Sequence, residues 1–347
     1  MSTGLVGVPL SLQPQSKKDY TSDQEVRWCP GCGDYAVLST FQSMMATFGI
    51  KRENTVIVSG IGCSSRFPYY MNTFGMHSIH GRAPAIATGL AITRPDLSVW
   101  VITGDGDSLS IGGNHLIHAL RRNVNLKILL FNNRIYGLTK GQYSPTSEQG
   151  KITKSTPEGS LDYAFNPVSL ALGAEATFVA RTIDSDRKHM TEVLRAAANH
   201  EGTALVEIYQ NCNIFNDGAW EPLKDNDTRD DVMMRLVDGE PIRFGKDNEK
   251  GVIRTPDGHI TVADVAVVGE DAIIRHDAHA KDPGLAFALS RLSNPRTLEN
   301  TPIGVFRDIN RPSYDRLVRE QIDTVIETKG PGNLQSLLNG SDTWAVS

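Results

Sequence analysis

The sequence has no apolar run that approaches the about 18 residues needed for a membrane-spanning helix. Its formal net charge of −5 is mildly acidic, so we expect no surface for nucleic acid or for an anionic membrane. The N-terminal stretch also lacks the order of a secretion signal, because Lys17 and Lys18 follow its weakly apolar part. These absences predict a protein of the reducing cytoplasm, where structural disulfides are not expected.

Cysteine is scarce, with only four residues in 347: Cys29, Cys32, Cys63 and Cys212. The first two form a C-x-x-C pair in "CPGC", a spacing that lets two thiolates reach one metal centre from a single turn. The other two directly follow predicted strands. Four such thiolates suit zinc or an iron–sulfur cluster, while a redox pair or simple buried thiols are the alternatives.

The sequence also lacks repeats, low-complexity tracts and a G-x-G-x-x-G loop after a strand, which disfavours a dinucleotide site. Strand and helix patterns instead alternate from about residue 34 to residue 210. Apolar strands are predicted at 55–59, 97–103 and 126–131, with amphipathic helices between and after them. This alternation predicts an α/β fold in which a parallel sheet is covered by helices on both faces and binds ligands at the strands' carboxyl ends.

The composition changes after about Asn216, where a polar stretch leads into short strands, turns and one late helix near 313–327. We therefore predict an N-terminal arm at 1–25, a main domain at 26–215 and an irregular C-terminal extension at 216–347. The extension carries no recognisable chemistry and is expected to pack on the main domain or on a partner.

Two polar motifs follow neighbouring predicted strands: "GDG" around Asp105 and "NN" ending at Asn133. One strand–helix–strand unit can bring Asp105, the Asn133 side-chain oxygen and the Ile135 carbonyl together as oxygen ligands for Mg²⁺. Gly104 and Gly106 allow the tight turn, and the amides of the following helix start can face phosphate. By itself, the GDG motif would predict only a turn. Together, GDG and NN at this spacing favour a diphosphate site.

This pair resembles the thiamine diphosphate-binding signature, and further motifs narrow the resemblance. The stretches "EVRWCPGCGDY", "GIGCSSRF", "HSIHGRAPAIATGLA", "GDGDSLSIGGNH" and "NNRIYGLTKGQYSPT" precede the late Cys212 in this order. Over about residues 25 to 215 the set is similar to the beta subunit of the 2-oxoacid:ferredoxin oxidoreductases, particularly the 2-oxoglutarate-using branch. The expected fold is therefore the parallel-sheet thiamine diphosphate-binding fold.

The resemblance implies three cofactors: thiamine diphosphate, Mg²⁺ and one 4Fe–4S cluster. It assigns the cluster to the four cysteines, which leaves zinc as a minor alternative. It assigns cofactor contacts to Ile61, Ser64, His80, Gly104, Gly106, Asp107, Gly137 and Leu138.

Three further residues lie near the expected site. Arg66 is expected to pair with a substrate carboxylate, with a solvated arginine as the alternative. For His77, contact with the cofactor and a structural capping role are equal alternatives. Lys140 stands where the family more commonly has glycine, which leaves its role open between the acidic substrate and coenzyme A.

The resemblance implies oxidative decarboxylation of 2-oxoglutarate to succinyl-CoA and CO₂, with one-electron transfers through the cluster to ferredoxin. Pyruvate or indolepyruvate as the substrate, or a zinc-braced non-catalytic scaffold, are the rival hypotheses. The chain has no second domain to supply the glutamate that activates the aminopyrimidine ring. An alpha subunit is therefore expected to supply it, in an α2β2 assembly.

Overall fold

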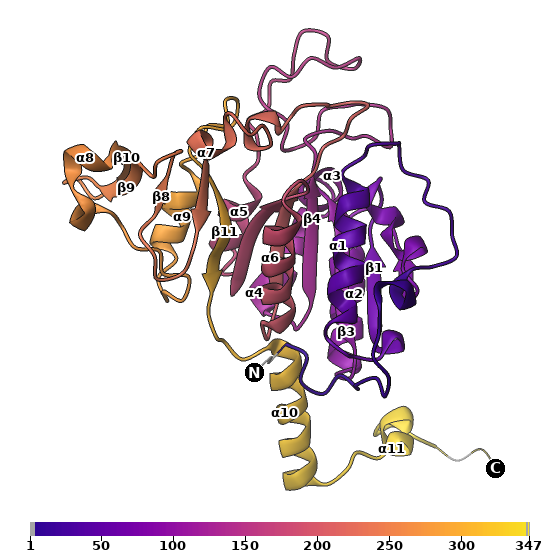
Figure 1. Ribbon diagram of the computed structural model, residues 1–347. Coiled ribbons are helices and arrows are strands. Elements are labelled where there is room, and N and C mark those ends of the chain that lie inside the picture. Colours follow the sequence, from indigo (N-terminus) through magenta and orange to yellow (C-terminus); the bar gives the residue numbers. More distant parts are fainter. Residues whose placement is uncertain (1–3, 345, 347) are drawn as a thin grey trace.

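The central feature of the computed structural model, which describes residues 4–344 and 346, is one eight-stranded sheet (Figure 1). Its strand order is β2-β1-β3-β4-β6-β5-β11-β7. The first six strands in this order are parallel, whereas β11 runs antiparallel to β5 and β7 runs parallel to β11. The strands are β1 (Thr55–Ser59), β2 (Phe74–His77), β3 (Ser98–Gly104), β4 (Lys127–Asn132), β5 (Phe178–Ile183), β6 (Ala204–Tyr209), β7 (Met233–Leu236) and β11 (Thr301–Asp308).

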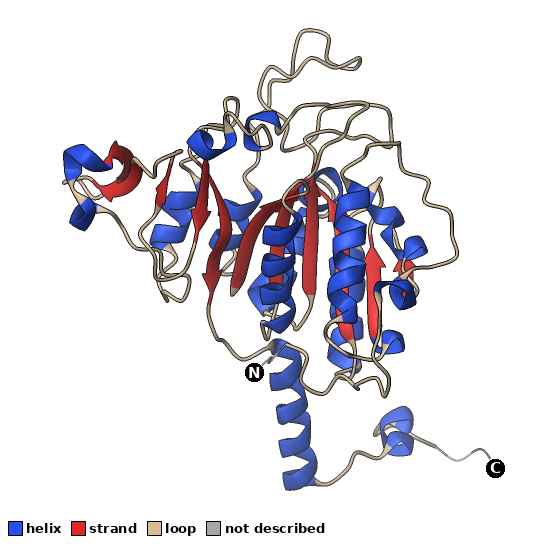
Figure 2. Cartoon of the chain, viewed as in Figure 1, coloured by secondary structure: helices blue, strands red, loops and turns tan. Residues whose placement is uncertain are grey.

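Helices cover both faces of this sheet (Figure 2). One face packs on α1 (Asp34–Ala46) and α6 (Arg187–Asn199). The other face packs on α2 (Ala83–Thr93), α4 (Gly113–Arg122), α5 (Pro167–Gly173) and α9 (Gly284–Ser290). The predicted α/β fold with a largely parallel sheet is confirmed.

Successive residues of the central strands point to opposite faces, and both faces are apolar. In β3, Val99 and Val101 join one core while Trp100 and Ile102 join the other. All four side chains are essentially fully buried. This explains why the strands are continuous apolar runs in the sequence, since a sheet covered on both sides has no solvent face.

The N-terminal arm lies across the edge of the main domain. It contains a 3₁₀ turn, η1 (Lys17–Tyr20), and its Tyr20 side chain is fully buried. The Tyr20 hydroxyl donates to the Ile50 carbonyl (3.2 Å). An isolated bridge also joins Leu10 to Ile50. Burial and these contacts hold the arm against α1.

The C-terminal extension contributes to the main sheet through β7 and β11 and also forms a small antiparallel sheet. That sheet consists of β8 (Arg243–Phe244), β9 (Lys250–Arg254) and β10 (Ile260–Asp264). Short helices α7 (Arg229–Val232) and α8 (Val265–Val268) accompany it. The division into 1–25, 26–215 and 216–347 stays a prediction, but residues beyond 216 complete the sheet rather than merely resting on it.

The late helix predicted at 313–327 is α10 (Tyr314–Lys329), which projects away from the body and is followed by α11 (Leu334–Asn339) (Figure 1). Its apolar residues Leu317, Ile322, Val325 and Ile326 are each about half exposed. Within the part of the chain that the structure describes, no helix combines the length and apolarity needed to cross a membrane.

Candidate functional site

A cavity of about 110 Å³ lies at the carboxyl ends of β1, β3 and β4. Its lining includes every residue that the sequence predicted for thiamine diphosphate and Mg²⁺: Ile61, Ser64, His80, Gly104, Asp105, Gly106, Asp107, Asn133, Ile135, Gly137 and Leu138. Gly62, Cys63, Phe131, Tyr136 and Thr139 complete it. Parallel strands end at one edge of the sheet, so residues from four distant segments, including His80 after β2, converge there.

Asp105 is the first residue of α3 (Asp105–Leu109), a short helix that begins where β3 ends. Its carboxylate is buried, and Oδ2 accepts hydrogen bonds from Ser144 Oγ (2.5 Å) and Thr146 Oγ1 (2.6 Å). Burial raises the pKa of Asp105 to about 6, and the two hydroxyls oppose this shift. Both hydroxyls contact Oδ2, and the backbone amides of Asp105 and Gly106 also favour the charged carboxylate.

The two asparagines at the end of β4 have different tasks. Asn132 donates from Nδ2 to Glu207 (2.7 Å), and its Oδ1 lies 2.8 Å from the Thr146 hydroxyl. Asn133 lines the cavity and donates from Nδ2 to Gln210 Oε1 (3.0 Å). Its Oδ1 accepts from the Ile135 amide (3.2 Å). The chemistry of this oxygen set fits the Mg²⁺ site predicted from Asp105, Asn133 and the Ile135 carbonyl.

Asp107 joins the loops that form the cavity wall. Its Oδ1 accepts from the amides of Ile61 (3.1 Å) and Gly81 (2.7 Å) and lies 2.5 Å from His80 Nδ1. Its Oδ2 accepts from Thr103 Oγ1 (2.7 Å). Four donors therefore satisfy this buried carboxylate, which accounts for a second acid beside a predicted phosphate site. His80 is oriented by Asp107 through Nδ1, so its Nε2 edge is the one available to a ligand.

Close packing requires glycine at two positions of this wall. A Cβ at Gly106 would lie 2.1 Å from the Tyr136 ring, and a Cβ at Gly60 would lie 1.8 Å from Asp107. The Tyr136 hydroxyl in turn donates to the Gly106 carbonyl (3.1 Å). The Tyr136 side chain therefore packs over the GDG turn.

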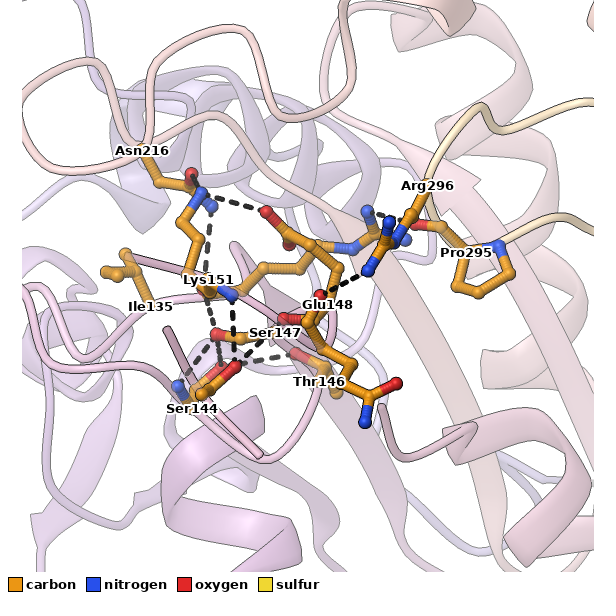
Figure 3. Close-up of polar contacts among 12 residues, drawn as sticks. Ile135, Ser144, Thr146, Ser147, Glu148, Lys151, Asn216, Pro295 and Arg296 are labelled. Carbon is orange, nitrogen blue, oxygen red and sulfur yellow. Dashed lines mark hydrogen bonds and ion pairs between the residues drawn. The ribbon is translucent and has the colours of Figure 1, made fainter. Parts of the chain in front are cut away.

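The loop of residues 144–151 is hydrogen-bonded to the segments that carry the predicted oxygen ligands (Figure 3). Ser147 donates to the Arg134 carbonyl (2.6 Å), and Lys151 donates to Asn216 Oδ1 (2.5 Å). Asn216 donates onward to the Asn133 carbonyl (2.8 Å). The C-terminal extension is attached to the same loop, because Arg296 donates to the Gln149 carbonyl (2.9 Å).

Hydrogen bonds bring the three cysteine-bearing segments together. Trp28, next to Cys29, donates from its indole nitrogen to the Cys63 carbonyl (2.7 Å). Asn213, next to Cys212, donates to the Pro30 carbonyl inside the CPGC turn (2.6 Å). Gly31 has a φ of +83°, a conformation that favours glycine, so the turn can bend between the paired cysteines.

Gly137 lies near two of the sulfur atoms. A Cβ at this position would lie 3.5 Å from both Cys63 Sγ and Cys212 Sγ, an ordinary van der Waals distance. Gly137 also lines the cofactor cavity, so these two sulfurs lie beside it. Soft sulfur donors of this kind fit an iron–sulfur cluster.

The zinc alternative stays open. Within the described residues, no three or more histidine, cysteine, aspartate or glutamate side chains are grouped so that they could hold a metal ion, and this applies to zinc and to a cluster alike.

Two of the cysteines, Cys32 and Cys63, are also unsuited to act as nucleophiles. Burial, and then the nearby charge of Asp34, raise the pKa of Cys63 to about 12. The same two causes raise the pKa of Cys32 above its ordinary range. Asp34 is itself buried, and burial followed by the charge of Asp184 raises its pKa to about 7. A thiol with a raised pKa is a poor nucleophile, whereas a bound metal would favour its thiolate.

Arg66 lies outside the small cavity, in an adjoining pocket of about 570 Å³. The two spaces share Gly62 and Leu138 in their walls. Arg66 donates from Nη1 to the Arg27 carbonyl (2.9 Å), and Arg27 lines the same pocket. His77 also lines it, with Nδ1 lying 2.8 Å from the Ser65 carbonyl, which agrees with a structural role for this histidine.

Lys140 adopts a φ of +75°, in the region that favours glycine. This conformation explains why glycine suits the position, since a lysine there carries backbone strain of about 1 kcal/mol or more.

Sequence reasoning missed the residues that support the ligands. Ser144 and Thr146 end the quoted motif "NNRIYGLTKGQYSPT", but their loop has no periodicity that indicates which way their hydroxyls point. Tyr136 and Gln210 lay inside or beside quoted motifs, but nothing in the sequence indicated which partners their side chains would reach.

Comparison with known proteins agrees with this geometry. Residues 60–208 match the family described as "Thiamine pyrophosphate enzyme, C-terminal TPP binding domain". The fold and site thus define the diphosphate-binding domain of a thiamine diphosphate enzyme.

The chain is 63% identical over 342 residues to 2-oxoglutarate oxidoreductase subunit KorB of Mycobacterium tuberculosis, covering 98% of this chain and 91% of that protein. It is 46% identical to the beta subunit of 2-oxoacid:ferredoxin oxidoreductase 1 of Aeropyrum pernix, covering 55% of this chain and 60% of that protein. The chain belongs to the family of 2-oxoacid:ferredoxin oxidoreductase beta subunits. The family predicted from the motifs is confirmed.

A solved structure is also similar over nearly the whole chain. It is the 2-oxoglutarate:ferredoxin oxidoreductase of Magnetococcus marinus with 2-oxoglutarate, coenzyme A and succinyl-CoA bound. The TM-score is 0.74 at 33% sequence identity, with 95% of this chain and 97% of that chain covered. The similarity therefore includes the C-terminal extension as well as the cofactor domain.

Proposed function

We propose that this chain is the beta subunit of a coenzyme A-dependent 2-oxoglutarate:ferredoxin oxidoreductase. The complex would convert 2-oxoglutarate to succinyl-CoA and CO₂ and pass electrons singly through a 4Fe–4S cluster to ferredoxin. The observation that carries the proposal is the convergence of all eleven predicted thiamine diphosphate and Mg²⁺ residues on one cavity, with Cys63 in the same wall.

In this proposal Asp105, Asn133 and the Ile135 carbonyl would hold Mg²⁺, which would bind the diphosphate. The amides that begin α3 and His80 Nε2 would be available to the phosphate oxygens. When bound, thiamine diphosphate supplies an electron sink for decarboxylation of a 2-oxoacid. The chain's own residues fix the diphosphate end, and Tyr136 packs over the GDG turn.

The cluster would be held by Cys29, Cys32, Cys63 and Cys212, with Gly137 between it and the cofactor cavity. This placement gives electrons a short route, because Gly137 lines the cavity and also approaches two of the sulfurs. A cytoplasmic location belongs to the proposal, since the ligands must remain reduced.

The adjoining pocket suits the acidic substrate. Arg66 and Arg27 both line it, and an arginine can bind a carboxylate through two parallel hydrogen bonds. We assign Arg66 to the distal carboxylate of 2-oxoglutarate, a group that pyruvate lacks. The names of the Mycobacterium relative and the Magnetococcus structure support the same acid.

The alpha subunit would cover the side of the sheet next to the cavity. Strand β2 is a sheet edge, and Phe74, Met76 and Ile79 on and beside it are 50% or more exposed. An exposed apolar edge next to a cofactor site favours a protein partner. That partner would supply the aminopyrimidine-side glutamate in an α2β2 assembly.

The test is anaerobic co-production with the alpha subunit, followed by iron, sulfide and thiamine analysis and by viologen reduction with three acids. We expect equal iron and sulfide, bound thiamine, and the highest rate with 2-oxoglutarate. Highest activity with pyruvate or indolepyruvate would contradict the substrate assignment. Colourless protein with stoichiometric zinc would contradict the redox function.

A further inference from the structure

The side chain of Gln210 connects the two halves of the site. It follows β6 directly and is almost completely buried. Its Oε1 accepts from Asn133 Nδ2 (3.0 Å), and its Nε2 donates to Cys32 Sγ (3.2 Å) and to the Asn211 carbonyl (2.5 Å). One amide group therefore reaches both an expected Mg²⁺ ligand and an expected cluster ligand.

The contact with Asn133 fixes which way its amide faces. Because Gln210 Oε1 takes the Nδ2 hydrogen, Asn133 Oδ1 must face the opposite side, toward Ile135. Only the oxygen of an asparagine can bind Mg²⁺, so this orientation decides whether Asn133 can be a ligand. Such supporting contacts typically change metal affinity by about 10–100-fold.

The contact with Cys32 acts on the sulfur. A hydrogen bond to a ligand sulfur withdraws negative charge and makes a cluster easier to reduce. The backbone holds the donor in place, because the Gln210 amide donates to the Asn132 carbonyl (3.0 Å) and its carbonyl accepts from the Trp220 indole (3.2 Å). Rotation of the side chain toward one site would break its contact with the other.

We propose that Gln210 is a positioning residue that acts on both cofactors, directing Asn133 Oδ1 at Mg²⁺ and raising the reduction potential of the cluster through Cys32. This inference rests on the proposed function, since it requires both cofactors. It predicts that a change to this one side chain alters both sites.

The test compares Gln210→Leu and Gln210→Glu with Gln42→Leu in the complete αβ complex. Gln42 is a matched control, because it is also a buried glutamine, but it donates to the Tyr70 carbonyl (3.0 Å) in the α1 region. Cluster potential is measured by electron paramagnetic resonance during redox titration, and Mg²⁺ dependence is measured by thiamine diphosphate retention. Thermal unfolding checks that each variant folds.

For Gln210→Leu we expect Mg²⁺ affinity to fall by about tenfold or more and the cluster to become harder to reduce by roughly tenfold, about 59 mV for one electron. Gln210→Glu keeps an acceptor for Asn133, so it should lower the potential while largely retaining Mg²⁺ affinity. Values like those of Gln42→Leu, or a change in only one property for Gln210→Leu, would overturn the proposal. A wild-type complex without cluster or thiamine would instead overturn the proposed function.

Discussion

The oxygen-lined and sulfur-lined halves of the site are built differently. Asp105 and Asp107 accept hydrogen bonds from hydroxyls, backbone amides and His80, so the oxygen half is held in place by the protein itself. In the sulfur half, Gln210 is the side chain among the described residues that donates to a sulfur, at Cys32. The oxygen half is preorganised, whereas the sulfur half would depend on the proposed cluster to balance buried thiolates.

The strongest test separates the two halves by removing one sulfur. We expect Cys212→Ser to lose essentially all cluster iron and all ferredoxin reduction, because one of four ligands is missing. Thiamine content should stay near that of the wild type, since the oxygen half does not depend on that sulfur. Both contents are measured on the anaerobically purified complex.

Ile214→Ser is the control for this change, because Ile214 is 56% exposed and lies two residues from Cys212. Its cluster content should equal that of the wild type. Loss of thiamine together with iron in Cys212→Ser would show that the halves do not assemble independently.

A smaller effect is expected from loosening the oxygen half. Thr146→Val keeps the shape of the side chain but removes the hydroxyl that contacts Asp105 and Asn132 (2.6 and 2.8 Å). Mg²⁺-dependent retention of thiamine diphosphate should weaken by about 10–100-fold, with the cluster signal unchanged. Equilibrium dialysis at varied Mg²⁺ measures the affinity.

Thr153→Val provides the matched control, because the Thr153 hydroxyl contacts only its own loop, including Thr156 (2.7 Å). Equal affinities for the two valine variants would mean that the hydroxyl of Thr146 does not support Asp105.

The smallest effect lies outside both halves, at His189 in α6. Burial, followed by the charge of Arg235, lowers the pKa of His189 to about 4, while Asp186 opposes the shift. Between pH 6.5 and 4 the unfolded chain binds a proton more readily than the folded chain, so stability falls as pH falls. Below pH 4 the free energy of unfolding is lowered by at most about 3 kcal/mol through this histidine.

His189→Gln should therefore flatten the loss of stability between pH 6.5 and 4 without changing cofactor content. Urea unfolding of the isolated chain at several pH values measures this. Parallel pH profiles for the variant and the wild type would contradict a protonation cost at His189.

Much of the fold follows from local patterns. Predicted strands at 55–59, 97–103 and 126–131 correspond to β1, β3 and β4 within a residue or so at each end. Asp186 caps the start of α6, where its side chain accepts from the His189 amide (3.0 Å). Strand β11 was harder to predict, because it pairs antiparallel with β5 across a large sequence separation and no local pattern reveals that partner.

The features of the site likewise divide into those that local patterns predict and those that they do not. GDG and NN predicted their own convergence, because both end neighbouring strands of one βαβ unit. The hydroxyls that donate to Asp105 and the contacts of the Gln210 amide were not predictable, since a serine, threonine or glutamine in a loop can face many partners. Lys140 shows the converse, because its positive φ explains why glycine suits the position, whereas nothing in the structure explains the lysine.

By itself the sequence determined which elements form and which chemical groups end the strands, because periodicity and residue type act over a few neighbouring residues. Only the tertiary structure decided that Gly137 lies near the sulfurs of both Cys63 and Cys212 and that Gln210 contacts both halves of the site. Those contacts join segments far apart in the chain, and their geometry depends on how the whole sheet packs.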